Sequence, residues 1–147
     1  NGTGTSRGSG IEAEGEWRIS PRFRLSANYA YQSATQPGPL AGAQVREVRR
    51  SKHSGSVALD GSSGRWSYGV GVAYTGSRID TDFDAYPART VSLHPYWLAD
   101  ARLAYRVSRT VELFVRTANA FDAHYEDVIG YRTQGRSLHA GIRLAGR

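Results

Sequence analysis

Alternating side chains mark the stretch Trp66-Ser67-Tyr68-Gly69-Val70-Gly71-Val72-Ala73-Tyr74-Thr75. Aromatic or branched apolar residues occupy every second position, and the residues between them are small or polar. Side chains of a β-strand point alternately to its two faces, so this period of two predicts a strand with one apolar face. A length of about ten residues suits a tilted strand that crosses a bilayer, whereas soluble strands more often have about five or six.

The same alternation recurs along the whole chain, and no stretch shows the 3.6-residue period of an amphipathic helix. The predicted strands lie at 11–19, 23–32, 55–59, 66–75, 97–107, 111–115 and 138–144. In the first of them Glu12, Glu14 and Glu16 share one face, which cannot be a dry core because unpaired carboxylates are too costly to bury. The sequence therefore predicts an all-β, antiparallel fold of about seven strands with one apolar and one polar face.

The connections between these strands alternate strictly in length. Tight turns are predicted at 20–22, 61–64 and 108–110, and long loops at 34–48, 79–92 and 122–136. A soluble antiparallel sandwich shares the alternating side chains but gives no reason for this sorting of loops. Short periplasmic turns and longer extracellular loops are typical of transmembrane β-barrels of the outer membrane.

Aromatic residues on the apolar face are sorted toward the two ends of the strands. One group lies near the tight turns and the other near the long loops: Trp17, Phe23, Trp66 and Tyr105, and Tyr29, Tyr31, Tyr74 and Trp97. Two aromatic belts that border an aliphatic middle are typical of a barrel wall that spans a bilayer.

Composition excludes some classes of protein. The 147 residues are 39% hydrophobic with a mean hydropathy of −0.50, and no apolar run approaches the roughly 20 residues of a transmembrane helix. The absence of cysteine excludes disulfides and thiolate metal sites. A net charge of +6 suggests an anionic neighbour. Only residues 46–52 form a basic cluster, and no nucleic-acid motif accompanies it. We interpret the cluster as a solvated strand end and expect lipid and lipopolysaccharide, not nucleic acid, as partners.

Two sets of loop residues are candidate sites. Asp80, Asp82 and Asp84 form an alternating acidic run that could bind Ca²⁺, but the glycine and glutamate of an EF-hand are missing. A solvated acidic loop that contacts ligand or a neighbouring loop is the preferred interpretation, and no cofactor is expected. Ligand contact is also predicted for exposed aromatic and arginine side chains in the last two long loops. These residues are Tyr86, Tyr125, Tyr131 and Arg132. Alternatively, Tyr125 and Tyr131 brace the loop against the rim.

Catalytic chemistry is not predicted. There is no G-x-S-x-G motif, and the four histidines lack metal-ligand spacing. The adjacent carboxylates of Glu126 and Asp127 would diverge on an extended backbone, which argues against acid/base catalysis. The chain is therefore not expected to be an enzyme.

Two segments carry a family resemblance. Residues 74–87 are similar to Y-x-G-x-R-x-D-x-D-(F/Y)-x-x-Y-P, and residues 119–136 to N-x-F-D-x-x-Y-E-x-V-x-G-Y-x-T-x-G-R. Both patterns resemble those of TonB-dependent outer-membrane receptors, most closely the members that transport vitamin B12 (cobalamin). The resemblance implies a barrel of about 22 strands around an N-terminal plug. It places this barrel in the bacterial outer membrane and implies that the TonB complex supplies the energy for transport. It also implies uptake of a large scarce ligand, with cobalamin first and a ferric siderophore second.

About seven strands cannot close a barrel of that size. We therefore expect residues 1–147 to be the C-terminal part of the receptor barrel, with the plug and the earlier strands absent from this chain. The alternative is a small stand-alone outer-membrane barrel, or a β-sandwich that acts as a binding module. Pairing of the first strand with the last distinguishes these possibilities.

Overall fold

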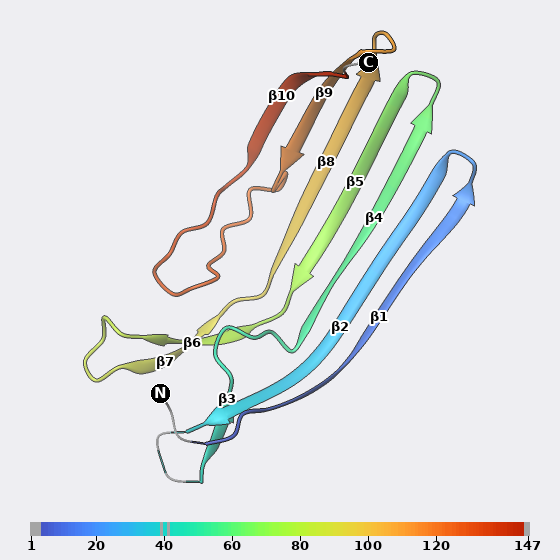
Figure 1. Cartoon of the computed structure of the whole chain (residues 1–147). Helices are drawn as coiled ribbons and strands as arrows, with labels where there is room; N and C mark the ends of the chain where they lie inside the picture. Colours follow the sequence, from blue (N-terminus) through green and yellow to red (C-terminus); the bar gives the residue numbers. More distant parts are fainter. Residues whose placement is uncertain (1–3, 39, 41, 146–147) are drawn as a thin grey trace.

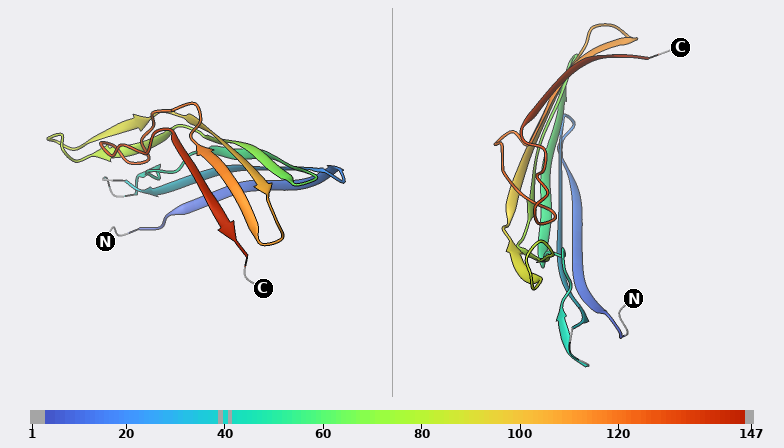
Figure 2. Two further views of the ribbon diagram at one scale, coloured as in Figure 1. Left: turned by 90° about the horizontal axis from the view of Figure 1, so that it is seen from above. Right: turned by 90° about the vertical axis from the view of Figure 1, so that its left-hand side faces the viewer.

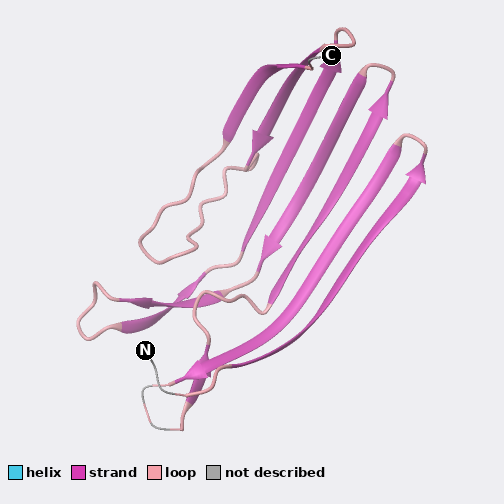
Figure 3. Ribbon diagram, viewed as in Figure 1, coloured by secondary structure: helices cyan, strands magenta, loops and turns pink. Residues whose placement is uncertain are grey.

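The computed structural model describes residues 4–38, 40 and 42–145 of the chain. Within those residues all regular structure is β-strand, and no helix is long and apolar enough to cross a membrane (Figures 1 and 3). The strands are β1 (Arg7–Ser20), β2 (Phe23–Pro37), β3 (Gln44–Arg46), β4 (His53–Ser63), β5 (Trp66–Thr75), β6 (Arg78–Asp82), β7 (Arg89–Leu93), β8 (Tyr96–Arg106), β9 (Val111–Ala118) and β10 (Ser137–Leu144). The predicted all-β fold is confirmed.

The main sheet is antiparallel and open. Its order is β1-β2-β4-β5-β8-β9-β10, with the short β3 paired to the end of β2. The sheet is curved, and its edge strands β1 and β10 are not paired with each other (Figure 2). A closed stand-alone barrel would pair these two strands, and a sandwich would need a second large sheet. Among the described residues the structure has neither, which agrees with the prediction of a barrel segment.

Short and long connections lie at opposite ends of the sheet. Tight turns join β1 to β2, β4 to β5 and β8 to β9 at the end of the sheet where β10 finishes (Figure 1). Two of the three long connections differ from the predicted loops because they contain further strands. β3 continues the sheet beyond the expected end of β2, and β6 pairs with β7 as a separate hairpin. The alternation of apolar and polar residues does not predict β6. Arg78, Asp80 and Asp82 put charged side chains at every second position, where a strand with an apolar face would have apolar ones.

The apolar face of the sheet is exposed and bordered by aromatic pairs. Near the tight turns the rings of Trp66 and Tyr105 lie 4.6 Å apart, and near the long loops Tyr74 and Trp97 are equally close. Between them Val70 is 56% exposed. Among the described residues only two apolar side chains, both near the long-loop end, are buried. Since the sheet has almost no core of its own, its apolar face needs an apolar partner such as lipid.

Ion pairs on the polar face link strands of the sheet. The Arg102 guanidinium of β8 reaches over β5 to the Asp60 carboxylate of β4, at 2.7 Å. Gly69 lies beneath this pair, where a Cβ atom would come within 2.4 Å of the Asp60 oxygen. Glycine at this position therefore lets the pair cross the middle strand. Both charged side chains are well exposed, so the pair adds at most about 1 kcal/mol.

Candidate functional site

Three long connections meet at one end of the sheet, around Asp80 of β6. Its side chain is 1% exposed. One carboxylate oxygen accepts hydrogen bonds from Arg49 Nε at 2.9 Å and from the Thr81 backbone N–H at 2.8 Å. The other accepts from the Ile129 backbone N–H at 3.0 Å. Because Arg49 precedes β4 and Ile129 lies between β9 and β10, Asp80 holds both neighbouring connections to the β6–β7 hairpin.

The charge of Asp80 is stabilised despite its burial. Burial alone would raise the pKa of this carboxyl group, because a dry environment disfavours the anion. The N–H groups of Ile129 and Thr81 and the Arg49 guanidinium outweigh burial and lower the pKa below its ordinary value of 3.8. The loops are thus held by a carboxylate that stays ionised at neutral pH.

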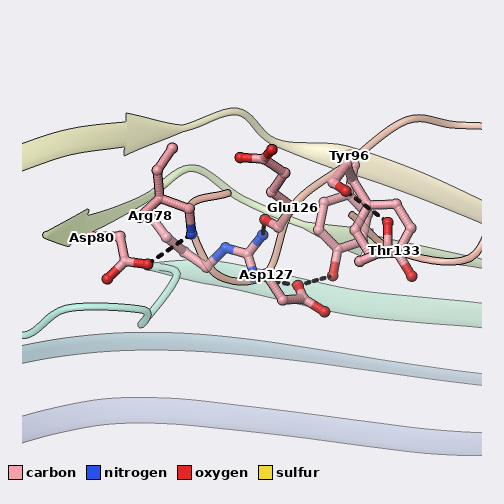
Figure 4. A network of polar contacts seen from close by, with 8 residues as sticks. Arg78, Asp80, Tyr96, Glu126, Asp127 and Thr133 are labelled. Carbon is pink, nitrogen blue, oxygen red and sulfur yellow. Dashed lines mark hydrogen bonds and ion pairs between the residues drawn. The ribbon is translucent and has the colours of Figure 1, made fainter. Parts of the chain in front are cut away.

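A second buried contact is made by Arg78, which is 6% exposed. It donates to Asp127 Oδ1 at 2.7 Å and to the Glu126 carbonyl at 3.0 Å (Figure 4). Its guanidinium lies 5.1 Å from the centre of the Tyr96 ring, and the Tyr96 hydroxyl donates to the same Asp127 oxygen at 3.0 Å. Tyr96 also stacks on Tyr125, with ring centres 4.1 Å apart. The last long loop is therefore anchored by charge and by aromatic contact together.

The last long loop begins at Asn119, which is 6% exposed and has a φ of 50°. Its side-chain amide donates to the Ala123 carbonyl at 2.9 Å and accepts from the Ala123 N–H at 2.8 Å. Its own N–H donates to Asp100 on β8 at 3.0 Å. At the other end of the loop, the Arg136 N–H donates to Asp122 at 2.7 Å. These bonds close the base of the loop and leave its middle free to form a surface.

A groove of about 910 Å³ lies between the last long loop and the segment that leads into β8. Of the predicted ligand contacts, Tyr125 and Arg132 line it, whereas Tyr86 and Tyr131 do not. Tyr86 is fully exposed beyond β6, and Tyr131 is 72% exposed. Stacking on Tyr96 also fits the alternative in which Tyr125 braces the rim. The remaining lining residues, which sequence reasoning did not select, are Ser92, Leu93, His94, Pro95, Ala123, His124, Glu126, Ile129, Thr133 and Gly135.

The acidic run does not form a metal centre by geometry. Asp80 is buried rather than solvated, and it contacts the neighbouring loops. Asp82 is paired with Arg89 at 3.2 Å and accepts a hydrogen bond from the Asp84 N–H. In the part of the chain that the structure describes, no three His, Cys, Asp or Glu side chains are grouped to hold a metal ion. Calcium binding here stays a prediction.

A curved antiparallel sheet with an aromatic-bordered apolar face, tight turns at one end and packed long loops at the other is the wall of an outer-membrane β-barrel. Residues 1–120 match the family described as TonB dependent receptor-like, beta-barrel. The chain belongs to this family, whose members are transport receptors of the bacterial outer membrane rather than enzymes. The polar face of the sheet is accordingly the lumen face, and the long loops are extracellular.

Solved structures show the same fold. The ferripyoverdine receptor of the outer membrane of Pseudomonas aeruginosa, bound to ferripyoverdine, has a TM-score of 0.79 at 20% identity over 95% of this chain and 19% of its own. The ferric-catecholate import receptor Fiu of E. coli K12 has a TM-score of 0.75 at 24% identity over 95% of this chain and 21% of its own. The copper transporter OprC has a TM-score of 0.75 at 17% identity over 95% and 23%. The chain thus spans about a fifth of the length of these proteins.

Proposed function

We propose that the complete protein imports a ferric siderophore across the outer membrane and draws energy from the TonB complex through an N-terminal plug. Membership of the receptor family and the ferric-chelate receptors among the similar structures support this choice. The observation that carries the proposal is the groove of about 910 Å³ beside the last long loop, which Asp80 and Arg78 hold in place. Its volume is in the usual range for a ligand site. Tyr125 offers apolar area, and Arg132 can bind the anionic oxygens of a chelate.

Cobalamin is the second candidate, and the similarity of residues 74–87 and 119–136 to cobalamin transporters favours it. Arg78 and Asp80 are two of the residues that carry this similarity. Their side chains contact loop residues and the loop backbone in the described structure. The shared residues thus support a shared loop architecture, and they argue less directly for a shared ligand.

The test is uptake by cells that carry the full-length gene. We expect iron-labelled siderophore to accumulate in a TonB-dependent manner, and labelled cobalamin to remain outside. Arg132→Ala should weaken siderophore binding at least about tenfold, because a lost charged hydrogen bond costs about 1.5–3 kcal/mol. Tyr131→Ala is the matched control, since Tyr131 lies next to Arg132 but outside the groove lining. TonB-dependent uptake of cobalamin alone would contradict the siderophore proposal.

A further inference from the structure

The basic cluster in the connection between β2 and β4 is separate from the groove. Its backbone leaves β2 and returns to it: the Glu47 N–H donates to the Ala34 carbonyl at 2.9 Å, and the Gln32 N–H donates to the Lys52 carbonyl at 2.9 Å. Residues 48–51 bulge away between these two bonds. A hollow of about 130 Å³ lies beside this bulge, lined by Gln32, Ser33, Ala34, Thr35, Arg46, Arg50 and Lys52.

Positive charge in this hollow exceeds negative charge. Three cationic residues line it, and no aspartate or glutamate is among the lining residues. Glu47 pairs with Arg50 at 2.9 Å and offsets one of the three charges. Arg46 is held in place by carbonyls only, with bonds of 3.0 Å to Arg50 O and 2.7 Å to Ser77 O. No ion pair is formed by Arg46 or Lys52 among the described residues. Like charges in so small a volume repel, so an anion there would be bound favourably.

The size of the hollow limits the anion. A water molecule takes about 30 Å³ of liquid volume, so 130 Å³ corresponds to roughly four waters. That space holds a phosphate group, and a whole metal chelate would extend beyond it. The lining arginines and lysine carry guanidinium and ammonium groups, and these charged donors suit phosphate oxygens.

The hollow begins where the aromatic belt ends. Tyr31 and His53 are the last paired residues of β2 and β4, with ring centres 5.2 Å apart. The lining residues Gln32 and Lys52 follow them directly on the extracellular side. Aromatic belts lie at the membrane–water interface, so the hollow lies at the height of the lipid headgroups.

We propose that Arg46, Arg50 and Lys52 form a binding site for a phosphate group at the outer rim of the barrel. Such a phosphate can belong to a lipid of the outer leaflet or to a soluble phosphorylated compound. The site is independent of the siderophore groove and would stand if the ligand of the receptor proved to be another. The proposal also gives a function to the basic cluster at residues 46–52, which the sequence analysis interpreted as a solvated strand end.

The experiment uses the full-length receptor in nanodiscs. Lipid A with its phosphates should bind at least tenfold more tightly than dephosphorylated lipid A. The double variant Arg46→Gln/Lys52→Gln should lose that difference. Arg89→Gln, which removes an exposed cation on β7, should keep it. Arg46→Lys/Lys52→Arg preserves the charges and should retain binding, which separates loss of charge from local misfolding.

A second arm measures protection of Lys52 from acetylation by inorganic phosphate in detergent. Protection by inorganic phosphate without preference for phosphorylated lipid A would support the site and assign it to a soluble group. Preference for lipid A would assign it to the membrane. The proposal is overturned if the unchanged receptor prefers phosphorylated lipid A and the glutamine double variant keeps that preference. It is also overturned if the unchanged receptor shows neither this preference nor protection of Lys52 by inorganic phosphate.

Discussion

Replacing Asp80 by asparagine should release the extracellular loops while leaving the sheet intact. The substitution keeps the shape of the side chain but removes its charge, and the new NH₂ group must face one of the donors that now bind Asp80. Because Arg49 is about half exposed, we discount the cost of a fully buried pair and expect about 2–3 kcal/mol. That cost corresponds to a roughly 30- to 150-fold increase in local opening.

Hydrogen exchange of the full-length receptor in detergent measures this opening directly. The Ile129 amide is the reporter, since its N–H donates to Asp80. Asp82→Asn is the matched control: Asp82 lies on the same strand, but its partner Arg89 is 70% exposed, so a change below about 1 kcal/mol is expected. Unchanged protection of Ile129 in Asp80→Asn would refute the inference that this carboxylate holds the loops together.

Further predictions concern pH, the membrane, the loop base and solubility. Because the pKa of Asp80 is lowered, its stabilising effect should persist down to the ordinary value of 3.8 and vanish only as pH falls through the lower folded-state pKa, as measured by Ile129 exchange corrected for intrinsic rates. Val70→Arg on the lipid face should cost about 2–4 kcal/mol in denaturant unfolding from vesicles, and Ala58→Arg on the lumen face clearly less. Asn119→Ala should lower stability by about 1–3 kcal/mol in the same assay, through lost hydrogen bonds and a strained positive φ. The isolated 147-residue chain should sediment from plain buffer, and a soluble monomer there would contradict a lipid-facing wall.

The strands of the main sheet were predictable because their signal is local. Alternation along residues 66–75 depends only on neighbours in sequence, and β5 has these same bounds in the structure. The order of short and long connections then indicated how the strands pair. Barrel walls keep one face toward lipid along their whole length, so the pattern is hardly disturbed by long-range contacts.

The site was less predictable because its signal is not local. Arg78 and Asp127 are 49 positions apart, and nothing near either residue shows that their charges meet. Alternating charges along β6 indicated a solvated loop, yet Asp80 is the most buried large side chain described. Tyr125 and Tyr86 are both tyrosines in predicted long loops, so the sequence does not distinguish them. In the structure Tyr125 packs on Tyr96 and lines the groove, whereas Tyr86 does not line it.

The crossing of β5 by the Arg102–Asp60 pair also bears on barrel assembly. A strand that slips by two residues keeps its apolar face toward lipid, so hydrophobicity alone does not forbid the slip. The pair needs Asp60 and Arg102 both opposite Gly69, and a two-residue slip at either side of β5 would shift the partners by about 7 Å. Stagger between strands sets the diameter of a closed barrel. An exposed ion pair of small energy can therefore select one alignment among several of equal hydrophobic quality, and with it the width of the lumen.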